Sequence, residues 1–252
     1  MLLYATLLLC SAIIGAQVYR YDLYDREPPH AIFLSLILGA IGLWLAGLTQ
    51  IEFIRFLGPT AAANFNLWMA FAAGTTEELA KLAVVAFIAL ASPRWFNDPL
   101  DGAIYGAFAG LGAAVYESFV HLGWPSPIDF PRTLPAAEPV RLMGHLIMGG
   151  IGGFGVGFLA TTHTSRRLRG LLILLACLAG AILLHIFWDV IAFEAADRGQ
   201  MLPWHTAVSI LLMLIGMITF RMLIRIGAPY SKAWINDRAP PPAPPSTPRR
   251  RG

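Results

Sequence analysis

Residues 171–193 read LLILLACLAGAILLHIFWDVIAF, an almost continuous apolar stretch that carries His185 and Asp189 near its end. A helix needs about 20 apolar residues to cross the hydrocarbon core of a bilayer, so this stretch predicts a transmembrane helix. Six similar stretches lie elsewhere in the chain, separated by charged residues, Pro and Gly, at roughly 1–19, 31–50, 62–91, 101–122, 142–161 and 204–226. The predicted fold is all-α, a polytopic transmembrane helical bundle of about seven spans, because a membrane-spanning sheet would need a closed barrel of alternating segments.

The first stretch resembles a signal peptide in its position. It lacks a basic start, and its apolar run extends to Val18 without a small-residue cleavage site. We therefore expect it to remain as a helix.

The composition also excludes a soluble domain. Of the 252 residues 57% are hydrophobic and 13% are charged, and the mean hydropathy is +0.63, whereas soluble domains contain roughly 25% charged residues. Cys10 and Cys177 both lie inside apolar stretches. This placement excludes a zinc ribbon and a secreted disulfide scaffold.

The positive charge of the chain predicts its orientation. The net charge is +3, and the excess comes from Arg residues beside the spans, at 166–169 and 249–251. The loops that follow the first, third, fifth and seventh spans carry thirteen Lys and Arg residues, and the other loops carry four. The positive-inside rule then predicts a multi-pass protein of the cell membrane with its N-terminus outside and its C-terminus in the cytoplasm. We expect lipid rather than nucleic acid beside these charges.

Two regions differ in composition. Residues 1–226 contain the predicted bundle, which we interpret as one transmembrane unit. Residues 227–252 become polar, basic and rich in Pro, Ala, Ser and Thr, a composition that cannot bury a core. We expect this second region to be a disordered cytoplasmic tail.

Several ionisable residues lie inside the predicted spans. Each costs about 2.5–3.5 kcal/mol on insertion scales, so it is a candidate functional residue. A purely structural interpretation is available for the third span, where Lys81 is placed to pair with Glu77 at i,i+4 and with Glu78 at i,i+3. That pairing leaves one negative charge unbalanced, and it does not account for the ionisable residues of the other spans. The full set is Glu77, Glu78, Lys81, Glu117, His145, His185 and Asp189.

The depth of these residues suggests one shared site. With the predicted orientation, Glu117, His145, His185 and Asp189 fall within about 12 Å of the outer boundary at 1.5 Å per helical residue. Glu77 and Glu78 lie deeper but within reach if their helix tilts. Polar groups from four helices therefore converge on one layer, which predicts a shared active site or ion site.

The spacing of these residues leaves two chemistries open. His185 and Asp189 are four residues apart, as are Glu117 and His121, so each pair shares a helix face. Such pairs suit a metal ion, which takes imidazole nitrogen and carboxylate oxygen. They also suit a carboxylate that activates water beside histidines that stabilise an oxyanion.

The ordered set of motifs resembles the PrsW family of intramembrane proteases and is more distantly similar to the type II CAAX prenyl endopeptidases. The resemblance covers about residues 20–195. Its elements are EExxK at 77–81, DGAIYG at 101–106 leading through 110–112 to Tyr116 and Glu117, His145 before a Gly-rich helix, and HxxxD at 185–189, together with Tyr21, Asp22, Asp25, Glu27 and Pro28 after the first span.

The resemblance implies hydrolysis of a peptide bond in a membrane-anchored protein, of the site-1 type, with an anti-sigma factor as an example. A polar layer toward the outer face agrees with a first cut on that side. The PrsW family is described as metallopeptidases, which implies a divalent metal such as zinc, whereas the CAAX enzymes imply a metal-free glutamate. His121 stands where the family commonly has an aromatic residue, and this departure leaves the ligand set open.

These considerations assign roles within the set. Glu77 or Glu78 takes a proton from the attacking water, and Lys81 holds the other glutamate. His145 and His185 stabilise the oxyanion or bind metal, while Asp189 orients His185 or completes the metal shell. The predicted catalytic residues are thus Glu77, Glu78, His145, His185 and Asp189, supported by Lys81 and Glu117, and the predicted metal ligands are Glu117, His145, His185 and Asp189.

Two other functions remain alternatives. A proton or metal-ion transporter would use the same buried residues, but it needs a polar path to both faces, and the cytoplasmic halves of the fourth to sixth spans are almost free of ionisable groups. A scaffold or sensor would use the polar layer for helix association and the Pro-rich tail for partner recruitment. The sequence leaves the substrate and the oligomeric state open.

Overall fold

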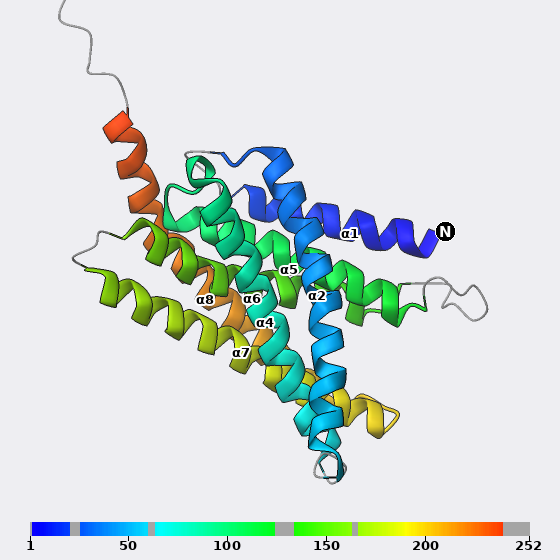
Figure 1. Cartoon of the computed structure of the whole chain (residues 1–252). Helices are drawn as coiled ribbons and strands as arrows, with labels where there is room; N and C mark the ends of the chain where they lie inside the picture. The colour runs from blue at the N-terminus through cyan, green and yellow to red at the C-terminus, as the bar shows by residue number, and fades with distance from the viewer. Residues whose placement is uncertain (1, 21–25, 60–63, 124–133, 163–165, 239–252) are drawn as a thin grey trace, which may run out of the picture.

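The structure is a computed structural model that describes residues 2–20, 26–59, 64–123, 134–162 and 166–238. These residues form seven long helices and no strand (Figure 1), which confirms the predicted all-α bundle. The elements are α1 (Leu2–Tyr19), α2 (Pro29–Leu57), α4 (Phe65–Ala91), the 3₁₀ turn η1 (Pro93–Trp95), α5 (Pro99–His121), α6 (Ala137–Thr161), α7 (Arg167–Asp197) and α8 (Pro203–Arg238).

Five of these helices, α2, α5, α6, α7 and α8, are long and apolar enough to cross a membrane. The apolar helix α1 is shorter. Helix α4 is long enough but carries Glu77, Glu78 and Lys81 close to its centre, so its side chains require partners within the protein. The seven predicted stretches therefore correspond to seven helices, of which five meet the criteria of a span on their own.

Local sequence signals explain where several helices begin. Pro occupies the first position of α2, α5 and α8, where its missing N–H is one that would be unpaired in any case. Helix α5 also has a capping box. Asp98 Oδ1 accepts from the Leu100 N–H at 2.6 Å, and Asp101 Oδ2 accepts from the Asp98 N–H at 2.8 Å.

The helices extend beyond the apolar stretches that predicted them. The expected loops at 51–60, 123–141 and 194–204 are partly helical, because α2 continues to Leu57, α6 begins at Ala137 and α7 continues to Asp197. Likewise α8 continues to Arg238, past the boundary expected at 226. Apolar runs mark only the hydrocarbon layer, whereas helical hydrogen bonds continue into the polar interface. The rest of the expected tail, 239–252, lies outside the described residues.

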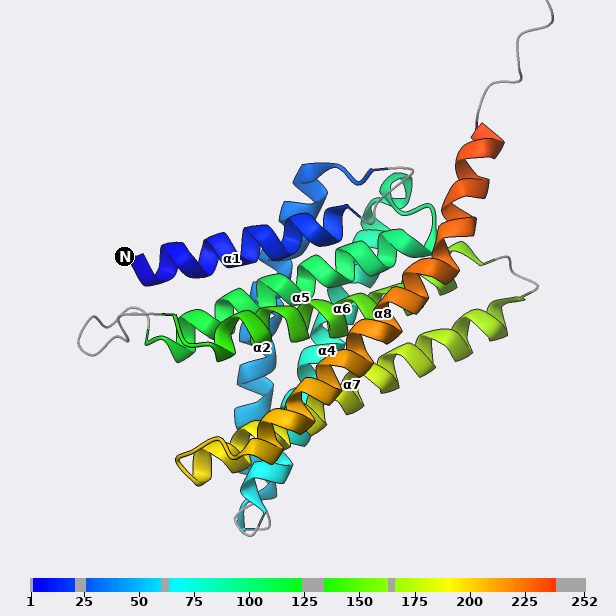
Figure 2. The ribbon, with the colours of Figure 1, turned by 180° about the vertical axis from the view of Figure 1, so that it is seen from behind.

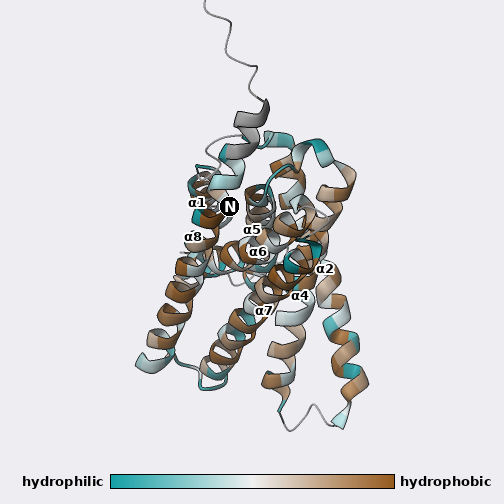
Figure 3. Cartoon of the chain, turned by 90° about the vertical axis from the view of Figure 1, so that its left-hand side faces the viewer, coloured by the Kyte–Doolittle hydropathy of each residue, from teal (hydrophilic) through white to brown (hydrophobic). Residues whose placement is uncertain are grey.

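Helices α5 and α6 form the centre of the bundle. In the most apolar 18-residue stretch of each helix, 72% of the residues of α5 and 89% of those of α6 are buried. The same share is only 17–28% for α2, α7 and α8. Figures 1 and 2 show α5 and α6 side by side, with α1 and α2 on one side and α7 and α8 on the other, while α4 packs between α2 and α7. Hydrophobic residues make up much of the outer helices (Figure 3), as expected for helices that contact lipid.

Glycines set the distance between α5 and α6. A Cβ at Gly106 would overlap the carbonyl oxygen of Gly149, and a Cβ at Gly102 would overlap that of Gly153. A Cβ at Gly110 would overlap the carbonyl oxygen of His145. Small residues at this spacing allow membrane helices to approach backbone to backbone. The close contact between the two central helices therefore requires these glycines.

The two ends of the bundle are held by different polar contacts. At one end Tyr105 donates to Glu27, and Ser231 donates to Asp98, which joins the start of α2 and the last part of α8 to α5. At the other end Asn66 Nδ2 donates to Asp197 Oδ2 at 2.5 Å, which joins the start of α4 to the end of α7. These contacts therefore tie together different helix ends at two separate places in the bundle. Which side faces the cytoplasm stays a prediction.

We expect Gly106→Ala to destabilise the bundle by about 1–3 kcal/mol, because the added methyl group would force the central helices apart. The matched control is Gly180→Ala in α7, where a Cβ meets nothing within 4 Å, and which we expect to be neutral or stabilising by up to about 1 kcal/mol. The measurement is the thermal midpoint in detergent. Equal midpoints for the two variants would contradict the proposed role of the glycines.

Candidate active site

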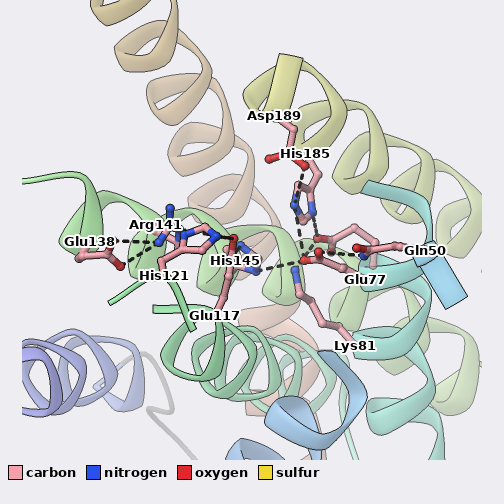
Figure 4. Close-up of polar contacts among 11 residues, drawn as sticks. Gln50, Glu77, Lys81, Glu117, His121, Glu138, Arg141, His145, His185 and Asp189 are labelled. Carbon is pink, nitrogen blue, oxygen red and sulfur yellow. Dashed lines mark hydrogen bonds and ion pairs between the residues drawn. The ribbon is translucent and has the colours of Figure 1, made fainter. Parts of the chain in front are cut away.

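The predicted polar residues come together inside the bundle (Figure 4). Helix α4 contributes Glu77, Glu78 and Lys81, and α7 contributes His185 and Asp189. His145 comes from α6 and Glu117 from α5. The residues of α5, α6 and α7 lie toward the end where α5 ends, α6 begins and α7 ends, and they meet the residues at the centre of α4.

Glu78 is held by two buried partners. Lys81 Nζ lies 2.6 Å from Glu78 Oε1, and His185 Nδ1 lies 2.7 Å from the same oxygen. All three residues are 2% exposed. The structural pairing expected for Lys81 is therefore made with Glu78. His185 donates through Nδ1, so its Nε2 is left to face the remaining carboxylates.

Glu77 points to the other nitrogen of His185. Its Oε1 accepts from Gln50 Nε2 at 3.2 Å. Its Oε2 lies 3.6 Å from His185 Nε2 and 3.9 Å from His145 Nδ1. Glu77 Oε2 and His145 Nδ1 are both buried and have no hydrogen-bond partner among the described residues. Buried polar atoms without a partner are costly and indicate a functional site or a bound species.

His145 is oriented in the same manner as His185. Its Nε2 lies 2.9 Å from Glu117 Oε2, so Nδ1 is the nitrogen directed at Glu77. Each histidine thus has one nitrogen at a carboxylate, Glu78 for His185 and Glu117 for His145, and the other nitrogen toward Glu77 Oε2. Figure 4 shows Glu77 with the two histidines and Glu117. This arrangement leaves three lone-pair-bearing atoms facing one another: one carboxylate oxygen and two imidazole nitrogens.

These three atoms fit a metal ion. The ligand atoms of Glu77, His145 and His185 all lie within 4.8 Å of one another. A tetrahedral zinc ion with bonds of about 2.0–2.1 Å separates its ligands by roughly 3.4 Å, close to the 3.6 and 3.9 Å observed. Two histidines and one glutamate form a known catalytic zinc set. Glu78 and Glu117 occupy the position of the carboxylates that orient metal-bound histidines from the second shell of such sites.

This set differs from the ligands expected from the sequence. Glu77 takes the place that we assigned to Glu117, because Glu117 contacts the nitrogen of His145 that points away from Glu77. Asp189 lies beside the set, with Oδ2 at 3.6 Å from His185 Nε2. The i,i+4 contact between Glu117 and His121 is made at 3.8 Å, but His121 is half-exposed and is not part of the group formed by Glu77, His145 and His185.

Two further residues support the site, and the sequence analysis did not identify them. Gln50 was placed at the end of a span, although it bonds to Glu77 and to Thr76 at 3.1 Å. Arg141 was counted as a loop cation, yet it lies in α6. Its Nε lies 3.5 Å from Glu117 Oε1, and its Nη1 lies 2.9 Å from Glu138. Gln50 could have been recognised as a candidate because it is a polar residue at the end of an apolar stretch that is predicted to be helical.

A cavity of about 350 Å³ opens beside the cluster. Its polar side includes Glu77, Glu117, His121 and Asp189. Its apolar side comes from α2, α4, α5 and α7 and includes Leu43, Trp44, Met69, Val120 and Phe193. The carboxylates of the site therefore adjoin a hollow that is large enough for part of a ligand.

The opposite end of the bundle also buries acidic side chains. Glu27, Asp98 and Asp101 are 3%, 2% and 1% exposed. Of these residues only Asp101 lies within the fourth to sixth predicted spans, at the first position of the fourth, while Glu27 and Asp98 precede spans. Between this group and Glu117, residues 103–114 of α5 are buried and uncharged and pack against the glycines of α6. This packing separates the two groups and disfavours a continuous polar path.

The fold and the cluster define a class: a polytopic membrane protein with a buried site of the histidine and carboxylate type used by hydrolases. The profile described as PrsW family intramembrane metalloprotease matches residues 27–220, most of the chain and all seven predicted site residues. The chain therefore belongs to this family, as the motifs indicated.

One curated relative is "Protease PrsW" of Bacillus subtilis (strain 168), which is 30% identical over 142 residues. The aligned region covers 55% of this chain and 60% of that relative, less than two thirds of its length. No solved structure matches the chain.

We expect Lys81→Met to destabilise the fold by about 3–5 kcal/mol, because it leaves the Glu78 carboxylate buried without its cation. The double variant Glu78→Gln/Lys81→Met should recover most of this loss. The matched control is Arg55→Met, which breaks an i,i+3 pair with Glu52 whose side chains are about 70% exposed, and which should change stability by less than about 1 kcal/mol.

Chemical denaturation in detergent measures all three variants. If Lys81→Met is as stable as Arg55→Met, the Lys81 contact does not compensate Glu78.

Proposed function

We propose that this protein is an intramembrane endopeptidase that hydrolyses a peptide bond of a membrane-anchored protein. The single observation that carries the proposal is the convergence of Glu77, His145 and His185 beside the cavity, each histidine held by a further carboxylate. Membership of the family supports it. A membrane-anchored protein cut at a first site is the substrate class that the family resemblance implies, an anti-sigma factor being one example.

The geometry favours metal-dependent hydrolysis over a metal-free glutamate. In the neutral tautomers that place the proton of His145 on Nε2, 2.9 Å from Glu117 Oε2, and that of His185 on Nδ1, beside Glu78 Oε1, the other nitrogen of each ring offers a lone pair. In these tautomers the three atoms that face one another are acceptors, an arrangement that suits a cation better than an oxyanion. Three carboxylates, Glu77, Glu78 and Asp189, surround His185, and Lys81 contributes one positive charge. A divalent ion balances the excess when all three are ionised.

Within this proposal Glu77, His145 and His185 would hold a divalent ion such as zinc. Such an ion supplies Lewis-acid polarisation of the scissile carbonyl and of the attacking water. Asp189 lines the cavity and is placed to accept the proton of the water and to pass it to the leaving amine. Glu78 and Glu117 hold the two imidazoles in the required tautomers, and Lys81 and Arg141 hold these two carboxylates.

The site lies toward the end of the bundle that carries the N-terminus of α1 and the start of α6. With the predicted orientation this is the outer side of the cell membrane. Cleavage is therefore proposed near the outer face.

We expect the purified protein to contain about one divalent ion per chain by elemental analysis. Glu77→Gln, His145→Ala and His185→Ala should each lose it, because each removes a ligand. Glu78→Gln should weaken binding by about 10–100-fold, as is typical when the partner of a ligand is removed. The control is Glu194→Gln, an exposed carboxylate of α7 that pairs with Arg198, which should retain the ion.

A protein that cleaves substrate with no ion bound would contradict metal dependence while leaving the protease proposal intact.

We expect the wild-type protein to cleave a member of a panel of tagged single-span proteins in proteoliposomes. Asp189→Asn should keep the ion but lower kcat by about 10²–10⁴, because it removes the proton acceptor. Glu194→Gln should keep wild-type activity. Product analysis by mass spectrometry locates the cut, which we expect near the outer end of the substrate span.

If wild-type protein leaves every member of the panel intact after loading with zinc, the endopeptidase proposal fails. If Asp189→Asn cleaves at the wild-type rate, Asp189 is not the proton acceptor.

A further inference from the structure

The cavity beside the site lies between two helices that diverge. Helix α2 crosses α5 in close contact near Gly39, where a Cβ would overlap the carbonyl oxygen of Ala109. At the same crossing Ser35 Oγ donates to the Tyr105 carbonyl at 2.6 Å. Beyond this point the last half of α2 follows α4, with Gly42 against Ala80 and Gln50 bonded to Thr76. Figure 1 shows α2 and α5 running at a steep angle to each other.

This divergence opens a wedge that leads to the carboxylates. One wall is the face of α2 formed by Leu43, Trp44, Gly47 and Gln50, whose spacing places them on one side of the helix. The facing wall is the last turn of α5, with Tyr116 and Val120. Trp44 is 51% exposed and Val120 is 54% exposed. The mouth of the wedge is therefore apolar and opens toward the lipid-facing surface, while its inner end is acidic.

Gly47 lines the wedge without a side chain. A Cβ at Gly47 meets no atom within 4 Å, unlike a Cβ at Gly39 or Gly42 of the same helix. The absence of a side chain at Gly47 is thus not required by helix packing. Any larger side chain there would extend into the cavity that Glu77 and Asp189 line.

We propose that the wedge between the last halves of α2 and α5 is the lateral entry and binding cleft for substrate, and that Gly47 provides room for a substrate side chain beside the scissile bond. This inference rests on the proposed function. The occupant is an extended, apolar segment at the end of a substrate span. Apolar walls favour such a segment, whereas Glu77, Glu117 and Asp189 at the inner end repel acidic side chains. The cavity volume lies within the range of about 300–1,000 Å³ found for ligand sites.

The first test compares Gly47→Leu with Gly180→Leu in proteoliposomes, using quenched single-span peptides as substrates. Gly180 is the matched control because a Cβ there also meets nothing within 4 Å, but it does not line the cavity. We expect Gly47→Leu to lower kcat/KM at least tenfold and Gly47→Ala to have a smaller effect. Gly180→Leu should stay within twofold of wild type, and all variants should keep the wild-type metal content and thermal midpoint.

Two outcomes of this comparison are decisive. If Gly47→Leu cleaves as Gly180→Leu does, the cleft assignment is wrong and the endopeptidase proposal stands. If Gly47→Leu loses activity while its metal content and thermal midpoint are unchanged, occlusion of the cleft is supported rather than unfolding. In Gly47→Leu, the loss of kcat/KM should be smaller for peptides that carry Ala at the cut than for the parent peptides with larger apolar residues there.

A second test needs no turnover and separates failure of the cleft from failure of the proposed function. Benzoylphenylalanine replaces Trp44 in one protein and Leu45 in another; both positions are about half exposed, and only Trp44 lines the cavity. If wild-type protein cleaves none of the peptides, the endopeptidase proposal fails. Crosslinking of the same apolar peptides then tests separately whether the wedge is a binding cleft. Preferential crosslinking at position 44 supports it, and equal crosslinking at both positions overturns it.

Discussion

The geometry of the site depends on one buried contact, in which Glu78 Oε1 accepts from both Lys81 and His185 Nδ1. A buried ion pair is weak evidence for net stability, because desolvation offsets much of its attraction. Its clear structural consequence is that it orients the imidazole of His185. The contact joins α4 to α7 and turns His185 Nε2 toward Glu77. It also separates two adjacent glutamates into different roles, one that holds a histidine and one that faces the ligand position.

The second histidine depends on backbone packing in the centre of the bundle. Gly110 of α5 lies directly against the backbone carbonyl of His145 in α6. This approach places Glu117, two helical turns further along α5, within 2.9 Å of His145 Nε2. The glycines that allow α5 and α6 to pack closely thus also bring Glu117 to His145. The same dense packing separates Glu117 from the buried acidic group at the other end of α5 and disfavours a continuous polar path between them.

The helices and the candidate site residues could be predicted from the sequence because each depends on local composition. Apolar runs predicted the seven helices, and the high energy of ionisable groups in a bilayer singled out the residues that meet in the site. Positions near helix ends were less accessible, because a hydropathy run does not distinguish the end of a helix from the end of the hydrocarbon layer. Gln50 and Arg141 were therefore assigned to a boundary and a loop, although both lie in helices and contact the site.

The sequence by itself determined that the protein is a helical membrane bundle of the PrsW family and which side chains are candidates for its chemistry. Only the tertiary structure decided which nitrogen of each histidine faces Glu77, that Glu78 and Glu117 hold the histidines, and that α2 and α5 diverge around Gly47. The reason is physical: helical periodicity fixes the face on which a residue lies, whereas contacts between helices depend on crossing angles and distances that are set by packing of the whole bundle.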